Sequence, residues 1–144
     1  MNLGVHDAVE AALRVVTQRY TPGRRALVDV MSSASAPVPL AALVKKSRQP
    51  QSSVYRNLSV LETAGVVRRI TGREDAFLYE LSEKLTEHHH HVVCVKCGTV
   101  SDADLGAAAE RALHRAAEEV GADSGFIIDS HSVDFYGYCR KCQS

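Results

Sequence analysis

Apolar residues in the first 64 positions recur three or four places apart, which is the spacing of one face of an α-helix. The pattern predicts four helices, over residues 5–20, 24–31, 40–46 and 50–64. Thr21 and Pro22 suit the N-cap and the first turn of the second helix. The fourth helix is amphipathic, and its polar face carries Gln51, Ser52, Tyr55, Arg56 and Ser59.

A predicted β-hairpin follows the fourth helix. Residues 66–69 and 76–81 have strand-like composition, and the polar residues 71–75 separate them. Helices followed by a hairpin are typical of a winged helix-turn-helix domain, which we assign to residues 1–82. Residues 83–87 are charged and lack periodicity, so we expect them to form a hinge.

The second half of the chain alternates between strand and helix patterns. We expect strands over 88–94 and 99–102, an Ala-rich helix over 105–120 that breaks at 121–125, and a strand over 126–136. Residues 88–144 are therefore predicted to form a small αβ domain, and the whole chain an α+β fold.

Charge adds an asymmetry to this division. The 144 residues carry 17 basic and 17 acidic side chains, but the net charge is +4 over residues 1–82 and −4 over 83–144. Between Arg14 and Arg73 there are 11 basic residues and 2 acidic ones. The first half is therefore a candidate for binding nucleic acid, the alternative being a solvated surface with chance clustering.

The sequence gives no sign of a membrane location. No apolar run approaches the ~20 residues that span a bilayer. Residues 1–10 lack the charged and apolar regions of a signal peptide. We therefore expect a cytoplasmic protein with no membrane partner, in which thiols stay reduced.

All four cysteines belong to two Cys-x-x-Cys pairs, Cys94 with Cys97 and Cys139 with Cys142. Structural zinc takes four thiolate or imidazole ligands in a tetrahedron, and two such turns supply two ligands each. The 41 residues between the pairs exceed the spacing of a compact zinc ribbon, so the fold must bring them together. Redox-active or free thiols are the alternative. The pattern favours one structural Zn²⁺ site.

Four adjacent histidines precede the first cysteine pair. They cannot all bind one ion, because a strand turns successive side chains to opposite faces. We expect His88 and His90 in one metal site and His89 and His91 in another, an expression tag being the alternative origin of the run. The candidate partners from elsewhere in the chain are Glu80, Asp102, Glu110 and His131. The remaining histidines, expected at the surface, are His6 and His114.

The polar face of the fourth helix is the candidate for contacting DNA. A recognition helix in the major groove needs short polar and basic side chains on its outer face. Tyr55 can contact a thymine methyl group or a phosphate, and Arg56 a phosphate or a guanine. Gln51 and Ser52 share this face, and Arg19 is a candidate contact to the DNA backbone. A merely solvated helix face is the alternative.

Three motifs, one in the first half and two in the second, combine into a specific set. The first is Ser53-Val54-Tyr55-Arg56-Asn57-Leu58. The second is His-His-His-His-x-x-Cys-x-x-Cys-Gly, and the third is His131-x-x-x-Phe135-Tyr136-Gly137-x-Cys139-x-x-Cys142. With them the chain resembles the ferric uptake regulator family of bacterial metal-dependent repressors, over residues 5–142.

The resemblance implies a homodimer that binds operator DNA through an N-terminal winged-helix domain and dimerises through a C-terminal αβ domain. It implies structural Zn²⁺ at the four cysteines. The implied regulatory site between the domains comprises Glu80, His89, His91 and Asp102. A further implied site in the dimerisation domain comprises His88, His90, Glu110 and His131. The positions that match DNA contacts of the family are Tyr55, Arg56 and Arg19.

Two features depart from the family pattern. Many iron-type members take a regulatory ligand from the loop before the third helix, whereas residues 35–38 offer none here. Zinc-type members often use an Asp soon after the recognition helix and a Cys before the histidines, where this chain has Arg68 and Leu81-Ser82. We therefore expect Zn²⁺ or Fe²⁺ as the regulatory metal, with Mn²⁺ and Ni²⁺ as further options, because affinity order alone cannot choose.

The expected function is metal-activated repression of genes for metal uptake and homeostasis. The alternative within the family is a peroxide sensor, in which Fe²⁺ held by His and Asp promotes oxidation of a ligand histidine. A zinc enzyme would need an open coordination position beside a general base, and no His-Glu-x-x-His or deaminase signature occurs. We therefore expect no enzymatic activity and no small-molecule substrate.

Overall fold

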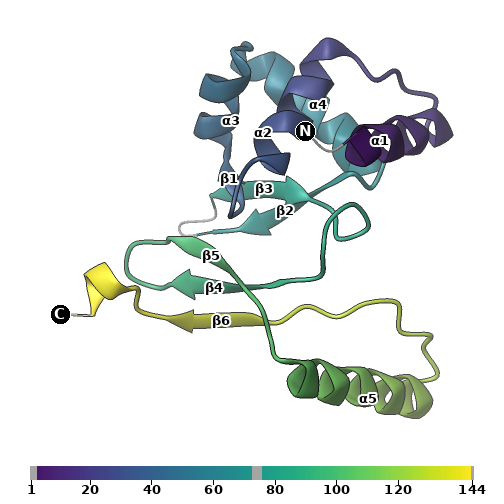
Figure 1. Ribbon diagram of the computed structural model, residues 1–144, viewed down its shortest axis with the longest axis vertical. Coiled ribbons are helices and arrows are strands. Elements are labelled where there is room, and N and C mark those ends of the chain that lie inside the picture. The colour runs from purple at the N-terminus through teal and green to yellow at the C-terminus, as the bar shows by residue number, and fades with distance from the viewer. Residues whose placement is uncertain (1–2, 73–75, 144) are drawn as a thin grey trace.

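Two small sheets, each with its own helices, make up the protein (Figure 1). The computed structural model describes residues 3–72 and 76–143. The N-terminal half contains α1 (Leu3–Val15), α2 (Pro22–Ser32), β1 (Val38–Pro39), α3 (Leu40–Ser47), α4 (Gln51–Thr63), β2 (Val67–Thr71) and β3 (Phe77–Leu81). The C-terminal half contains β4 (His90–Cys94), β5 (Val100–Ala103), α5 (Ala107–Ser124), β6 (Asp134–Gly137) and the 3₁₀ helix η2 (Arg140–Cys142). None of the described helices is both long and apolar enough to cross a membrane.

The strand registers decide which side chains can meet. The first sheet has the order β1-β3-β2 with antiparallel pairs, so Arg68 of β2 lies opposite Glu80 of β3. In the second sheet β4 is central, antiparallel to β5 and parallel to β6. His91 is therefore flanked by Asp102 on β5 and by Asp134 on β6. The predicted α+β fold, with helices and a hairpin preceding a second αβ unit, is confirmed.

The first helix is shorter than the predicted 5–20. Thr17 adopts a left-handed conformation, with φ of 59°. The amide of Gln18 then bonds back to the carbonyl oxygen of Leu13, at 2.9 Å, which closes the end of the helix. The predicted N-cap of α2 is confirmed, because Thr21 accepts a hydrogen bond from the amide of Arg24, although the helix begins at Pro22 and not at the predicted residue 24.

The boundaries predicted around residues 121–136 are wrong. Helix α5 continues through Gly121, and Gly125, with φ of 76°, ends it. A Cβ at Gly121 would lie 2.8 Å from the carbonyl oxygen of Phe126, so this glycine permits a close approach of the chain. Strand β6 begins only at Asp134, where β4 supplies a partner. The two-residue strand β1 escaped prediction because it is too short to show a period of two, and the predicted loop 71–75 lies partly, at 73–75, outside the described residues.

The hydrophobic core lies in the N-terminal half. The core contains Val54, Leu58 and Leu61 of α4, as the amphipathic pattern predicted. It also contains side chains from α1, α2 and α3 and from the hairpin of β2 and β3, which we call the wing. Helix α5, in contrast, has no buried residue within the described chain. The exposed large apolar side chains of the C-terminal half include Val120, Phe126, Ile127, Tyr136 and Tyr138. Apolar exposure on this scale is typical of a surface that meets another protein.

Truncation of Leu58 tests the assignment of the core. Leu58→Ala should lower the free energy of unfolding by about 2–5 kcal/mol, because it leaves a cavity under α4. Ser59→Ala, at the exposed neighbouring position, is the control and should change it by less than about 0.5 kcal/mol. Urea unfolding followed by circular dichroism measures both. Equal effects of the two substitutions would contradict the assignment.

Candidate metal centres and DNA-binding surface

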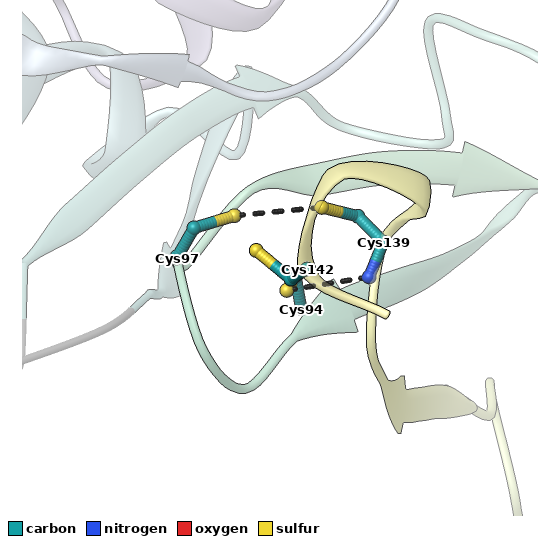
Figure 2. Close-up of side chains that lie close together, drawn as sticks. All are labelled: Cys94, Cys97, Cys139 and Cys142. Atoms are coloured by element: carbon teal, nitrogen blue, oxygen red, sulfur yellow. Dashed lines mark hydrogen bonds between the residues drawn. The ribbon is translucent and has the colours of Figure 1, made fainter. Parts of the chain in front are cut away.

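The two cysteine pairs meet beside the end of β4 (Figure 2). Cys94 and Cys97 bracket the turn after β4, and Gly98, at φ of 77°, donates its amide to the Cys94 carbonyl oxygen at 2.9 Å. Cys139 and Cys142 follow β6, which runs parallel to β4 and so delivers them to the same end. The four Sγ atoms lie within 4.8 Å of one another. The fold thus closes the 41-residue separation in the sequence.

The sulfur geometry fits a tetrahedral zinc ion. Zn–S bonds of ~2.3 Å imply neighbouring sulfur atoms about 3.8 Å apart, and the Sγ atoms of Cys97 and Cys139 are 3.8 Å apart. The amide of Cys139 donates to the sulfur of Cys94 and, with further amides, lowers the pKa of Cys94 to about 6. Contact with Cys139, then burial, raises the pKa of Cys142 to about 12. Because the four thiols are so close together, all of them lose their protons only when a bound cation takes the place of the protons.

A second group of ligand-type side chains, the hinge cluster, contains Glu80, His89, His91 and Asp102. Glu80 comes from β3 of the first sheet, whereas His91 and Asp102 come from β4 and β5 of the second. Oε2 of Glu80 is 3.0 Å from Nε2 of His89 and 3.2 Å from Nε2 of His91. Oδ1 of Asp102 is 3.9 Å from both nitrogen atoms. A tetrahedral ion with bonds of 2.0–2.1 Å separates its ligands by about 3.3 Å, so these four donors fit one ion.

The histidine rings of the hinge cluster are oriented by contacts on their other nitrogen atoms. Nδ1 of His89 is 3.0 Å from the carbonyl oxygen of Glu87, and Nδ1 of His91 is 3.4 Å from Oδ1 of Asp134. When Nδ1–H donates to these acceptors, the lone pair of Nε2 faces the centre of the cluster. Sequence reasoning missed Asp134, because only the parallel pairing of β6 with β4 brings it beside His91.

Contacts within the hinge cluster shift the pKa values of its members. Burial raises the pKa of Glu80, but hydrogen bonds from His91 and His89 and the charge of Arg68 outweigh it and lower this pKa to about 2. The hydrogen bond to Glu80 raises the pKa of His91 above its usual value. Burial lowers the pKa of His89, but bonds to Glu87 and Glu80 give a net rise. A metal ion at this position therefore competes with protons for the ring nitrogen atoms that face Glu80.

A third group, the α5 cluster, contains His88, His90, Glu110 and His131. Nε2 of His90 is 2.5 Å from Oε1 of Glu110. Oε2 of the same carboxylate is 3.4 Å from Nε2 of both His88 and His131, which are themselves 3.2 Å apart. Nδ1 of His90 is buried without a hydrogen-bond partner within the described chain. Three imidazoles converging on one carboxylate form a donor set that suits a divalent transition metal.

The alternation of side chains along a strand accounts for both histidine groups. His89 and His91 face Glu80 on one side of β4, while His88 and His90 face Glu110 on the other. The structure thus brings together both groups of four residues that the family resemblance implied. His114, expected alone at the surface, is exposed, but its ring lies 5.9 Å from that of His131.

The prediction that His6 lies at the surface is wrong. Its side chain is buried, with Nδ1 2.6 Å from the hydroxyl of Tyr20 and Nε2 2.8 Å from Oδ1 of Asp29. Burial raises the pKa of Tyr20 to about 12. The contact needs the turn after α1, which brings Tyr20 back to the start of that helix, and the pattern of the sequence does not show this turn.

The predicted DNA-contacting residues all lie on exposed positions. Gln51, Ser52, Tyr55 and Arg56 form the outer face of α4, and Arg19 is exposed in the connection between α1 and α2. The exposed fraction of Tyr55 is 48%, which is large for an aromatic residue in a domain with a well-formed core. The face is therefore free to meet another molecule.

A hydrogen-bond network that sequence reasoning missed joins this face to Arg19. The guanidinium of Arg24 donates to the carbonyl oxygen of Arg19 at 2.6 Å and to Oδ1 of Asn57 at 3.2 Å. Nδ2 of Asn57 donates to Oε1 of Gln49, whose amide in turn donates to the carbonyl oxygen of Gly23. Asn57 belongs to the motif of the fourth helix, so the sequence marked this residue but did not show which side chains it contacts.

Substitution of Glu80 tests these pKa shifts. In metal-free protein, Glu80→Gln should lower the pKa of His91, since the bond to Glu80 is the largest cause of its rise. The raised pKa of a histidine stabilises the folded state fully below about pH 6.5, and this stabilisation is lost as the pH rises through the pKa of the folded state. The lowered pKa of a glutamate stabilises the folded state above about pH 4.5, and this stabilisation is lost as the pH falls through the pKa of the folded state. The destabilisation by Glu80→Gln should therefore be larger at about pH 5.5 than at about pH 8.

NMR titration of the imidazole protons and unfolding at the two pH values measure both effects. Glu87→Gln is the control, because only the backbone carbonyl of Glu87 contacts His89. An unchanged pKa of His91 in the Glu80→Gln variant would exclude the arrangement described.

Known proteins resemble this chain along most of its length. It is 35% identical to a ferric uptake regulation protein of Bordetella parapertussis, over 64% of this chain and 61% of that protein. It is 30% identical to ferric uptake regulation protein 2 of Mycolicibacterium fortuitum, over 90% and 89% of the two chains. The peroxide-responsive repressor PerR of Staphylococcus aureus is 27% identical, over 92% and 88%.

Solved structures share the fold. The ferric uptake regulator Fur of Helicobacter pylori, in which three functional metal binding sites are described, superposes with a TM-score of 0.74 at 20% identity, covering 98% of this chain and 93% of that one. The sequence model of the ferric uptake regulator family matches residues 16–136, which include α4, the hinge cluster and the first cysteine pair. The chain therefore belongs to the ferric uptake regulator family.

Proposed function

We propose that this protein is a homodimeric, metal-responsive repressor whose binding to operator DNA is activated by a divalent metal in the hinge cluster. One observation carries the proposal: the four donors come from both halves of the chain. Glu80 is fixed in the wing sheet, and His91 and Asp102 are fixed in the second sheet. An ion bound by all four donors would hold the wing against the second sheet.

The ion can act as a switch only if it binds one arrangement of the two halves more tightly than another. When the halves separate, Glu80 leaves the two histidines, and the ion loses a charged ligand. The closed arrangement therefore binds the ion more tightly than the open one, and the ion in turn favours closure. In a dimer, closure fixes the separation of the two α4 helices, which sets the spacing of DNA half-sites they can contact.

The face of α4 supports DNA as the partner. Tyr55 and Arg56 project from it beside Gln51 and Ser52, and Arg19 stands at the connection that Arg24 and Asn57 hold in place. Basic residues outnumber acidic ones 11 to 2 between Arg14 and Arg73. A positively charged surface of this kind contacts phosphates and supplies much of the affinity for DNA.

The exposed apolar surface of the C-terminal half supports a second copy of the chain as the other partner. Val120 of α5 and Phe126, Ile127 and Tyr136 beyond it are more than half exposed. Burial of this surface between two copies would supply the core that α5 lacks in one chain. Membership of the ferric uptake regulator family also supports a second copy of the chain as this partner.

We assign structural Zn²⁺ to Cys94, Cys97, Cys139 and Cys142, since four thiolates saturate a tetrahedral ion. The hinge cluster, with two imidazoles and two carboxylates, suits Zn²⁺ or Fe²⁺, and also Mn²⁺ or Ni²⁺. The α5 cluster is a further metal site that joins α5 to β4. In this role the protein needs no catalytic residue and no small-molecule substrate, and it acts in the cytoplasm, where bacterial operator DNA lies.

Metal titration tests the proposal. Protein that retains the cysteine-bound zinc but is otherwise metal-free should bind an AT-rich promoter duplex about 5–150-fold more weakly than protein given Zn²⁺ or Fe²⁺. His89→Ala should abolish this difference, because it removes a hinge-cluster donor. His114→Ala, a substitution of an exposed histidine on α5, is the control and should preserve it. Equal DNA affinity of the wild type with and without metal, measured by fluorescence anisotropy, would overturn the proposal.

A peroxide sensor is the second candidate, and the position of Asp102 beside His89 and His91 is compatible with it. The similarity to PerR of Staphylococcus aureus supports the same function. In this case Fe²⁺ and hydrogen peroxide should add one oxygen atom to His89 or His91, and Asp102→Ala should prevent the addition. Peptide mass spectrometry measures it, with Mn²⁺ in place of Fe²⁺ as the control. No oxygen adduct on any histidine would remove this candidate.

A further inference from the structure

Arg68 places a fixed positive charge next to the hinge cluster. It lies opposite Glu80 in the β2–β3 pair, and both Nε and Nη2 are 2.5 Å from Oε1 of Glu80. Nη2 is also 3.4 Å from Oε1 of Glu83. Two carboxylates thus contact the guanidinium. The side chain of Arg68 is 33% exposed and that of Glu80 only 10%, so little water competes for their contact.

The two oxygen atoms of Glu80 therefore have different partners. Oε1 is occupied by Arg68, whereas Oε2 faces Nε2 of His89 and of His91. A carboxylate that coordinates through both oxygens must present both to the ion. Here Oε1 could do so only after its charge-assisted bonds to the guanidinium break, and such bonds are among the stronger ones in proteins.

This restriction limits how many ligands the hinge cluster can offer. With Glu80 confined to Oε2, the donors are two imidazole nitrogen atoms, a single oxygen of Glu80 and the carboxylate of Asp102. Zn²⁺ is satisfied by four ligands in a tetrahedron. Mn²⁺ prefers six ligands that are rich in oxygen, so it loses more when a carboxylate oxygen is withheld.

We propose that Arg68 is a positioning residue that confines Glu80 to one coordinating oxygen and thereby favours Zn²⁺ over Mn²⁺ in the hinge cluster. This inference rests on the proposed function, in which the hinge cluster holds the regulatory metal. The charge of Arg68 repels every divalent cation to a similar degree, so it changes absolute affinities and leaves their ratio unaffected. The ratio of Zn²⁺ to Mn²⁺ affinity therefore reports how Arg68 restrains Glu80, separately from the repulsion between Arg68 and the ion.

The test compares Arg68→Gln with Arg69→Gln in full-length protein that keeps its cysteine-bound zinc. Arg69 is the neighbour on β2, and it pairs with Glu62, at 2.9 Å, away from the hinge cluster. Zn²⁺ and Mn²⁺ affinities are measured by chelator competition. The double variant His89→Ala/His91→Ala gives the binding that does not belong to the hinge cluster, and this background is subtracted.

Arg68→Gln should lower the ratio of Zn²⁺ to Mn²⁺ affinity by about tenfold or more, and Arg69→Gln should leave it unchanged. Visible absorption of Co²⁺ in the hinge cluster should change from the intense bands of four-coordination to the weak bands of higher coordination only in Arg68→Gln. An unchanged ratio, or Zn²⁺ and Mn²⁺ affinities that fall together, would overturn the inference. If the double variant binds both metals as the wild type does, the proposed function fails instead.

Discussion

Glu80 joins the two sheets of this protein, and the rest of its behaviour depends on that contact. The carboxylate is fixed in the wing hairpin opposite Arg68 and reaches His89 and His91 at the start of the second sheet. The hydrogen bond to this carboxylate raises the pKa of His91. Burial lowers the pKa of His89, but its bonds to Glu87 and to this carboxylate give a net rise. A divalent ion offers the same oxygen a stronger partner, so metal and protons compete for one position between the domains.

The central place of β4 lets one short segment serve three centres. Its alternating faces send His91 toward the wing and His90 toward α5, while its end carries Cys94 to the cysteines that follow β6. Structural zinc there would hold β6 beside β4, and β6 carries Asp134, which orients the ring of His91. The cysteine site and the hinge cluster are thus connected through β6, although they differ in chemistry and in proposed role.

Much of this arrangement follows from the sequence, because the signals are local. Strand alternation separates His88 and His90 from His89 and His91, and the helical spacing of Val54, Leu58 and Leu61 fixes which face of α4 is exposed. What could not be predicted depends on non-local pairing. Asp134 meets His91 only through a parallel strand, the burial of His6 requires the turn after α1, and the contact of Arg68 with Glu80 requires the register of the hairpin. The roles of these residues are therefore visible only in the fold.

In the proposed function, an ion in the hinge cluster fixes the placement of the wing relative to the C-terminal half. The distance between spin labels at position 59 of α4 in the two copies of the proposed dimer measures this placement. The labels are introduced as a noncanonical amino acid, and pulsed electron paramagnetic resonance records the distance without DNA. We expect a broad distance distribution in protein that holds zinc only at the cysteines, and a single narrow distribution after the hinge cluster is loaded with metal. The same distribution before and after loading would contradict it.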